Sequence, residues 1–208
     1  MIISTGRKYV FVHIPKTGGT SLTTALEARA MRDDILIGDT PKAKLRKNRL
    51  KSLTTPGRLW KHSTSADVAG LFDPSQMFTF TLTRNPWDRM VSYYTWLQAQ
   101  TFDHAAVTLA QSNNFSDFLN NPQTVASIAN NPYASYVPND AHFFRVELLA
   151  TDLQPLWDHL GFSLTIPHIN ASNRPRDWRP YYSDADAALI AKICATDIAR
   201  GGYQFTPL

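Results

Sequence analysis

Apolar runs along the chain alternate with stretches in which apolar residues recur at helical spacing. The run at residues 8–14 predicts a strand buried on both faces, and residues 21–31 predict a helix with one apolar face. Between residues 77 and 83, phenylalanine and leucine alternate with threonine, which is typical of a second strand. A helix should follow, because Asn85 can cap it and Pro86 suits its first position.

The C-terminal part of the chain repeats this order of strand and helix. We expect a third strand at residues 142–149, a helix at 152–161 and a longer helix at 183–202. Residues 99–141 are helical or irregular, in an order that the pattern does not define. Because strands that alternate with helices form parallel crossovers, the predicted fold class is α/β. The predicted architecture is three-layer α/β/α with a central parallel sheet, and ligands should bind beyond the carboxyl ends of its strands.

Length and composition limit the organisation of the chain. With 208 residues and 43% hydrophobic content it can bury one substantial core, so we expect a single domain over residues 1–208. The only cysteine, Cys194, cannot form an internal disulfide, which favours a reducing compartment and a cytoplasmic location. The sequence has neither the pattern of a signal peptide nor an apolar stretch long enough for an integral membrane segment.

The loop after the first predicted strand, HIPKTGGTSL at residues 13–22, has the composition of an anion-binding loop. Gly18 and Gly19 let backbone N–H groups approach an anion, and the N-terminus of the next helix adds partial positive charge. Lys16 supplies a full charge at the same place. Three hydroxyl donors complete the loop: Thr17, Thr20 and Ser21.

This loop differs from the nucleotide-binding pattern GxxxxGK[ST]. Here the lysine precedes the glycines, and Gly6 lies too far upstream to complete that pattern. A nucleotide triphosphatase also needs a carboxylate at a neighbouring strand end to help hold magnesium, but the second predicted strand is followed by Arg84. Two cationic strand ends indicate a ligand whose charge is neutralised by the protein rather than by a metal.

Together, HIPKTGGTSL and TLTRNPWDRMVSYY at residues 81–94 resemble the two cofactor loops of sulfotransferases that use 3′-phosphoadenosine 5′-phosphosulfate (PAPS). The closer match is to the carbohydrate branch, which includes Golgi-type and bacterial enzymes. RVELL at residues 145–149 and IPHINAS at 166–172 extend the resemblance, which is thinnest at residues 32–60 and 99–140. It implies a P-loop NTPase-like fold and metal-free transfer of sulfonate from PAPS to a hydroxyl, which leaves 3′-phosphoadenosine 5′-phosphate (PAP).

In that family the first loop holds the 5′-phosphosulfate. The second holds the 3′-phosphate through an arginine at the strand end and a serine on the following helix. Carried over by position, the resemblance implies these cofactor-binding residues: Lys16, Thr17, Gly18, Gly19, Thr20, Ser21, Arg84 and Ser92. A helix that begins near Pro86 would place Ser92 about two turns along, where its hydroxyl can converge with Arg84 on one phosphate.

The resemblance also implies a catalytic histidine between the two loops, and His62 in LWKHSTSADV at residues 59–68 occupies that place. A neutral imidazole near its ordinary pKa could take the proton of the acceptor hydroxyl, while Lys16 stabilises the departing phosphate oxygen. Two alternatives stay open: His62 as a partly exposed residue ahead of a capped helix, and Glu147 as the base. On a strand, Glu147 would instead form a buried pair with Arg145 or another cation. His13 should orient the loop from the strand end.

Every charged residue between Asp39 and Asp67 is basic. This segment could guide an anionic acceptor such as an acidic glycan, or it could be a solvated loop. Farther along the chain, Arg174 and Arg176 could close over the cofactor, but they are expected to be solvated at the surface. Trp87 and Trp178 could stack on a base or a sugar, but they are expected to be buried in the fold.

We therefore expect a cytoplasmic PAPS-dependent sulfotransferase. Its hydroxyl-bearing acceptor should be an anionic glycan, and we expect no nucleic-acid partner. Two alternatives remain. A nucleotide kinase or triphosphatase would need magnesium and would prefer ATP. A non-catalytic module would bind nucleic acid or another polyanion through residues 42–61, with a steep dependence on salt.

Overall fold

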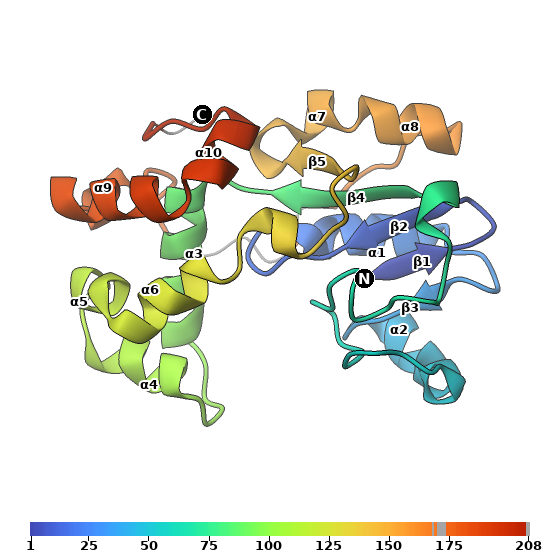
Figure 1. The fold of residues 1–208 in the computed structure, drawn as a ribbon, viewed down its shortest axis with the longest axis horizontal. Helices are drawn as coiled ribbons and strands as arrows, with labels where there is room; N and C mark the ends of the chain where they lie inside the picture. Colours follow the sequence, from blue (N-terminus) through green and yellow to red (C-terminus); the bar gives the residue numbers. More distant parts are fainter. Residues whose placement is uncertain (168, 170–173, 207–208) are drawn as a thin grey trace. The chain divides into compact units, whose positions relative to one another are not determined.

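The computed structural model describes residues 1–167, 169 and 174–206, and the chain divides into two compact units (Figure 1). Unit 1 comprises Met1–Thr83 and Tyr133–Asn170, and unit 2 comprises Arg84–Pro132 and Ala171–Leu208. Among the described residues, unit 1 has two hydrophobic clusters and unit 2 has one. The single-domain organisation over residues 1–208 stays a prediction.

Unit 1 is built on a five-stranded sheet in the order β3-β1-β2-β4-β5 (Figure 1). Its strands are β1 (Ile2–Ser4), β2 (Tyr9–Val12), β3 (Ile35–Leu36), β4 (Phe78–Thr83) and β5 (His142–Arg145). The strands β2, β4 and β5 are parallel, whereas β1 pairs antiparallel with β2 and with β3. The α/β fold class and the three parallel strands are confirmed. The two antiparallel strands, which make the sheet mixed, are too short to give a periodic signal.

The helices of unit 1 are α1 (Gly19–Ala28), α2 (Pro41–Arg46), α7 (Leu149–Asp152) and α8 (Gln154–Leu160). Short 3₁₀ turns also occur: η1 (Lys47–Ser52), η2 (Pro74–Gln76), η3 (Tyr133–Ser135) and η4 (Val146–Leu148). The strand predicted at 142–149 therefore ends at Arg145, and Glu147 lies in a 3₁₀ turn rather than on a strand.

Alternation along β2 divides the core of unit 1 between two faces of the sheet. Tyr9 and Phe11 belong to a cluster that includes Leu22 and Leu26 of α1, and Figure 1 shows α1 behind the sheet. Val10 and Val12 belong to a second cluster, which also includes side chains of the segments that precede β4 and β5. The sheet is thus buried on both faces, as the apolar run in residues 8–14 predicts.

Unit 2 is helical in the part that the structure describes. It contains α3 (Pro86–Gln98), α4 (Ala105–Ser112), α5 (Phe115–Asn120), α6 (Pro122–Ala129), the 3₁₀ turn η5 (Arg179–Tyr181), α9 (Asp184–Ile193) and α10 (Ala195–Gly201). The predicted helix at 183–202 is interrupted at Cys194, which caps α9 and precedes α10. None of the described helices combines the length and the apolar character that spanning a bilayer requires.

The core of unit 2 is rich in aromatic side chains. Trp87 and Trp178 are buried and stack with ring centroids 6.3 Å apart, which confirms their expected burial. Trp87 also donates a hydrogen bond from Nε1 to the carbonyl of Ala187 at 3.0 Å. These contacts attach α3 to the C-terminal segment of the chain.

Candidate functional site

The loop Pro15–Gly18 leaves the carboxyl end of β2 and leads directly into α1, as the sequence predicts. Lys16 has φ 66° and Gly18 has φ 78°, so both have left-handed backbone conformations. The buried hydroxyl of Thr17 donates a hydrogen bond to the carbonyl of Ile14 at 2.9 Å. Thr17 therefore uses its hydroxyl hydrogen to hold the tight turn of this loop.

The two glycines are required by close packing. A Cβ at Gly18 would lie 2.7 Å from Cγ2 of Val146, and a Cβ at Gly19 would lie 2.3 Å from Cδ2 of His13. The helix α1 begins at Gly19 with no side-chain cap and no acidic residue in its first turn. Its first backbone N–H groups can therefore donate to an anion, and the helix dipole favours negative charge there.

The last two hydroxyl residues of the loop lie in the first turn of α1 and are half-buried. Ser21 accepts a hydrogen bond from the backbone N–H of Ile169 at 3.2 Å, and its Oγ lies 3.4 Å from the carbonyl oxygen of the same residue. Thr20 accepts a hydrogen bond at its carbonyl from the Thr24 hydroxyl at 3.0 Å. Ser21 thus joins the start of α1 to the segment that follows α8.

His62 lies next to this loop because its Nδ1 is 2.7 Å from the carbonyl oxygen of His13, the residue two positions before Pro15. A carbonyl can only accept, so the hydrogen of the neutral imidazole is on Nδ1. The lone pair is then on Nε2, which is the atom that can take a proton. The imidazole rings of His62 and His13 also meet edge to face, with centroids 4.8 Å apart.

The pKa of His62 is lowered from 6.5 to about 4, chiefly because burial disfavours the charged imidazolium. Lys61 lowers the pKa further, while the His13 carbonyl and Asp39 act in the opposite direction. Burial also holds the pKa of His13 well below its ordinary value. The expectation of an ordinary pKa for His62 is therefore wrong. The side chain is neutral at physiological pH, and it is a weaker base than a solvated histidine.

The turn that carries His62 is fixed by Ser63, which is fully buried. Its hydroxyl donates to the carbonyl of Arg58 at 2.8 Å and accepts from the backbone N–H of Trp60 at 2.9 Å. The backbone N–H of Ser63 donates to the carbonyl of Trp60 at 2.9 Å. These bonds close the turn, so His62 is held by the backbone on one side and by His13 on the other.

The second loop follows β4 and begins unit 2. Asn85 caps α3 by accepting from the backbone N–H of Trp87 at 3.2 Å, as predicted. The Nε of Arg84 lies 2.6 Å from the Asp88 carboxylate, and Arg174 pairs with the other oxygen of the same carboxylate. The side chain of Arg174 is only 7% exposed, so its expected solvation at the surface is wrong. Asp88 thereby orients two arginines, which the sequence did not reveal.

Ser92 is buried on α3, one helical turn after Asp88. Residues four apart share a helix face, so Ser92 lies on the face that carries the Asp88 carboxylate and the Arg84 side chain bound to it. This arrangement is compatible with the predicted convergence of Arg84 and Ser92 on one phosphate.

A family model described as the sulfotransferase family matches residues 1–194. The chain belongs to the sulfotransferase family. This membership confirms the predicted reaction class, enzymatic sulfonate transfer. Among solved structures, mouse sulfotransferase SULT7A1 complexed with PAP is similar, with 15% identity and a TM-score of 0.48 over 96% of this chain and 87% of that chain. No curated protein sequence matches.

The residues predicted for this sulfotransferase fall in both units. Lys16, the loop that follows it and His62 belong to unit 1, whereas Arg84 and Ser92 belong to unit 2. Within unit 1, β2 and β4 are parallel neighbours, so their carboxyl ends open on the same edge of the sheet. The binding of one donor by all of these residues stays a prediction.

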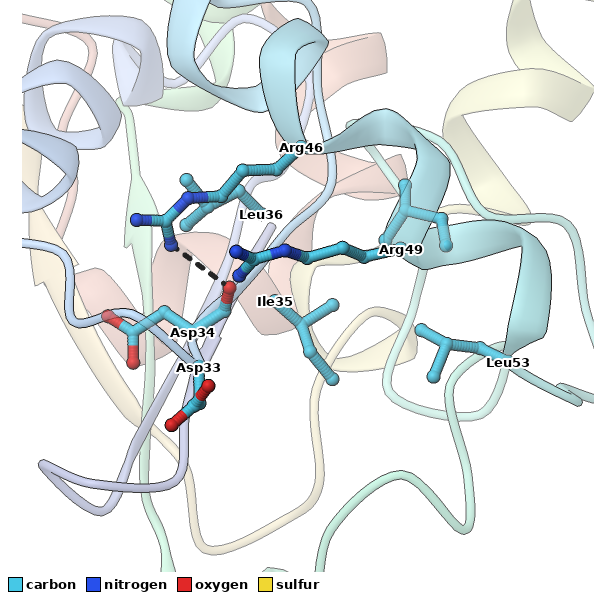
Figure 2. Close-up of a pocket in the computed structure, with 8 residues that line it drawn as sticks. Asp33, Asp34, Ile35, Leu36, Arg46, Arg49 and Leu53 are labelled. Carbon is cyan, nitrogen blue, oxygen red and sulfur yellow. Dashed lines mark hydrogen bonds between the residues drawn. The ribbon is translucent and has the colours of Figure 1, made fainter.

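A cavity of about 210 Å³ lies beside β3 and η1 of unit 1 (Figure 2). Arg46 and Arg49 line it, and Arg46 donates hydrogen bonds to the carbonyls of Met31 at 2.7 Å and of Asp34 at 3.3 Å. None of the predicted site residues lines this cavity. It is therefore separate from the glycine loop and from His62.

The basic segment at residues 42–61 forms α2, η1 and an irregular stretch that leads to His62. Some of its cations contact protein oxygen atoms: Lys42 donates to the carbonyl of Glu27, and Lys61 pairs with Asp39 at 2.8 Å. Others have exposed side chains: Lys44, Lys47, Lys51 and Arg58. The segment thus contributes both to structure and to a positively charged surface.

The remaining candidate acids and bases have structural contacts. Arg145 binds the Asp152 carboxylate through Nε at 2.8 Å and a terminal nitrogen at 2.9 Å. His142 begins β5 and stacks on Phe78. His159, on α8, donates a hydrogen bond from Nε2 to the carbonyl of Arg7 at 2.9 Å. His168, within the IPHINAS segment, lies outside the described residues.

Proposed function

We propose that this sulfotransferase transfers the sulfonate group of PAPS to a hydroxyl of a carbohydrate acceptor. The observation that carries the proposal is the contact between His62 and the glycine loop. A histidine that is neutral, with its proton on Nδ1, is anchored to His13, which precedes the loop that leads into an uncapped helix N-terminus. This places a proton acceptor beside an anion-binding loop.

The loop suits the phosphosulfate end of the donor on three grounds. Lys16 and Gly18 have positive φ values, which give the loop a tight turn. Close packing excludes a side chain at Gly19, and the first turn of α1 contains no acidic residue. Backbone N–H groups and a lysine are the donors that a phosphate prefers in proteins. Arg84, oriented by Asp88, supplies a forked cation for the 3′-phosphate, and Ser92 a hydroxyl.

PAPS would supply an activated sulfonate whose leaving group is a phosphate. His62 accepts the acceptor's hydroxyl proton at Nε2 as the hydroxyl oxygen forms its bond to sulfur. The bond from sulfur to the bridging phosphate oxygen breaks, and Lys16 stabilises the negative charge that develops on that oxygen. Nδ1 keeps its hydrogen bond to His13 throughout, which holds the imidazole in one orientation.

An anionic glycan is the acceptor that we favour. The exposed lysines of residues 42–61 lead along the chain to His62, so a negatively charged polymer would be attracted toward the proton acceptor. We also propose a cytoplasmic location, which the single cysteine supports.

Isothermal calorimetry with PAP tests the donor. We expect binding in the absence of magnesium and no comparable binding of ATP, whereas a kinase or triphosphatase would prefer ATP with magnesium. A polyanion-binding module would bind neither nucleotide and would instead bind heparin, with a steep salt dependence. Either of those results would overturn the proposal.

Three variants separate the proposed roles. Lys16→Ala should lower kcat about 100-fold or more, and His62→Gln about 100- to 10,000-fold, with smaller effects on PAP binding. Arg84→Ala should chiefly weaken PAP binding, by about tenfold or more. Lys192→Ala is the control, because it removes an exposed lysine of α9 that lies outside both loops and outside the basic segment at residues 42–61. Full turnover in Lys16→Ala would exclude its assigned role.

A further inference from the structure

Trp60 lies two residues before His62 and is 45% exposed. Among the described residues of unit 1, it is the only tryptophan, phenylalanine or tyrosine in the exposed class. The large aromatic side chains of the sheet are buried, including Tyr9, Phe11 and Phe80. An exposed indole on a folded surface leaves much apolar area in water, which is a feature of ligand-binding surfaces.

The exposure of Trp60 is built into a fixed turn. Its backbone N–H and carbonyl both bond to Ser63, at 2.9 Å each, and Ser63 is fully buried. The adjacent Lys61 is tied to Asp39 at 2.8 Å. Further on, Thr64 donates from its backbone to Asp67 at 2.7 Å. The indole is therefore presented by an ordered backbone and loses little conformational entropy when a ligand binds.

The Trp60 indole also lies next to His62, the proposed base. Its ring centroid lies 5.0 Å from that of His62, and the two rings are nearly perpendicular, at 86°. A ring stacked on the indole would have its centroid about 4.5–7 Å away. The imidazole is adjacent to the indole, so a ring that packs on the exposed part of the indole can present a hydroxyl on its edge to the imidazole.

We infer that Trp60 is the stacking surface for the acceptor, and that the acceptor presents its hydroxyl on a pyranose ring. One face of a pyranose is lined by C–H bonds and packs on an indole, while its hydroxyls project from the ring edge. An acyclic alcohol has no such face. This inference rests on the proposed function, since it takes His62 as the base.

Saturation-transfer NMR with PAP present tests this inference. The probes are the methyl pyranosides of glucose, galactose, N-acetylglucosamine and glucuronic acid, and sorbitol is the acyclic polyol for comparison. We expect at least one pyranoside, but not sorbitol, to receive saturation from the wild-type protein. Trp60→Ala should weaken that binding about tenfold or more, and Trp60→Phe should retain most of it. Trp60→Leu keeps an apolar side chain but has no flat ring face, so it should behave like the alanine variant.

Trp96→Ala is the matched control, because Trp96 is also exposed, at 38%, but lies on α3 in unit 2. It should bind the pyranoside as the wild type does. The inference is overturned if no pyranoside binds, if sorbitol binds equally well, or if Trp60→Ala binds as the wild type does. PAP binding, measured separately, distinguishes this failure from that of the proposed function, and thermal unfolding confirms that each variant is folded.

Discussion

At the scale of single residues, His62 has two ring nitrogens with different surroundings. Nδ1 is 2.7 Å from the His13 carbonyl, and this contact leaves the proton-accepting lone pair on Nε2. Burial lowers the pKa of the same ring to about 4. The contact with His13 therefore fixes the tautomer of His62, and burial keeps the ring uncharged. The ring must be neutral before it can accept a proton.

The lowered pKa of His62 predicts a loss of stability in acid. In the unfolded chain the imidazole has its ordinary pKa of 6.5, whereas in the folded protein it is about 4. Below pH 6.5 the unfolded state gains a proton that the folded state does not, so stability falls as the pH falls toward 4. At pH 5 this amounts to about 2 kcal/mol.

Urea unfolding at pH 7.5 and pH 5 measures this effect. The wild-type protein should lose more stability between these pH values than His62→Gln does, because the variant lacks one of the two buried histidines. His142→Gln is the control, since His142 has an exposed side chain on the same unit. Equal losses in the wild type and His62→Gln would contradict the burial of a neutral imidazole.

Asp88 is the second residue whose contacts support the proposed site. It contacts both Arg84 and Arg174 and is itself largely buried. Asp88→Asn should weaken PAP binding about tenfold and destabilise the fold by about 1–3 kcal/mol, because charge-assisted hydrogen bonds to two guanidinium groups are lost.

Calorimetry and urea unfolding test this prediction together. Asp177→Asn is the matched control: Asp177 pairs with Arg179 at 2.7 Å, but both side chains are largely exposed, so neither measurement should change. If Asp88→Asn bound PAP as tightly as the wild type, Asp88 would have no part in orienting Arg84.

At the scale of elements, the strongest sequence patterns correspond to the elements that carry the site. The apolar run before Lys16 and the alternation of phenylalanine with threonine before Arg84 both correspond to parallel strands. Strands inside a sheet need apolar side chains at regular spacing, because their side chains are buried against the core. The cap at Asn85 likewise identifies the start of α3. These local signals need no knowledge of tertiary contacts.

What the sequence could not reveal depends on distant partners. The strands β1 and β3 have three and two residues, too few to show a period, and they are defined by pairing with each other and with β2. The burial of Arg174 depends on Asp88, 86 positions away. The low pKa of His62 and the exposure of Trp60 likewise depend on what packs around one short turn. Trp60 is visible in the motif LWKHSTSADV, but the motif does not distinguish a buried indole from an exposed one.

Close packing at the junction between β2 and α1 lets us predict the effect of adding one methyl group at Gly19. Gly19→Ala would place its Cβ 2.3 Å from the buried imidazole of His13, so we expect destabilisation of about 1–3 kcal/mol. His13 must shift, and its carbonyl is the partner of His62, so kcat should fall as well.

A double-mutant cycle measures this collision. The cost of Gly19→Ala should be smaller in a His13→Ala background, in which the imidazole is absent. Gly38→Ala is the control, because its Cβ would have one ordinary contact, 3.8 Å from Cβ of Lys61. An unchanged cost of Gly19→Ala in the His13→Ala background would show that the collision is not its cause.

At the scale of the whole molecule, two cores stabilise two units that are interleaved along the chain. Phe118 belongs to the core of unit 2 and Phe80 to that of unit 1, and both are almost fully buried. Substitution of either by alanine should cost about 3–5 kcal/mol. Hydrogen exchange measured by mass spectrometry should show faster exchange mainly in the unit that contains the substitution.

The peptides of α3–α6 and those of the sheet are the readouts. Phe118→Ala should accelerate exchange in the helical peptides more than in β2 and β4, and Phe80→Ala should do the reverse. Equal acceleration in both sets of peptides, for both variants, would show that the two units open only together.

The interleaving of the units also has a consequence for synthesis. The core of unit 1 includes Leu153 and Leu156, and that of unit 2 includes Ile190 and Tyr203. On the ribosome, helices α3–α6 of unit 2 are made before β5, but some of the residues that pack against their apolar faces lie in α9 and beyond. Until α9 and α10 have been made, aromatic side chains of α3 and α5 lack part of their packing partners, so we expect this stretch of the nascent chain to bind chaperones during elongation.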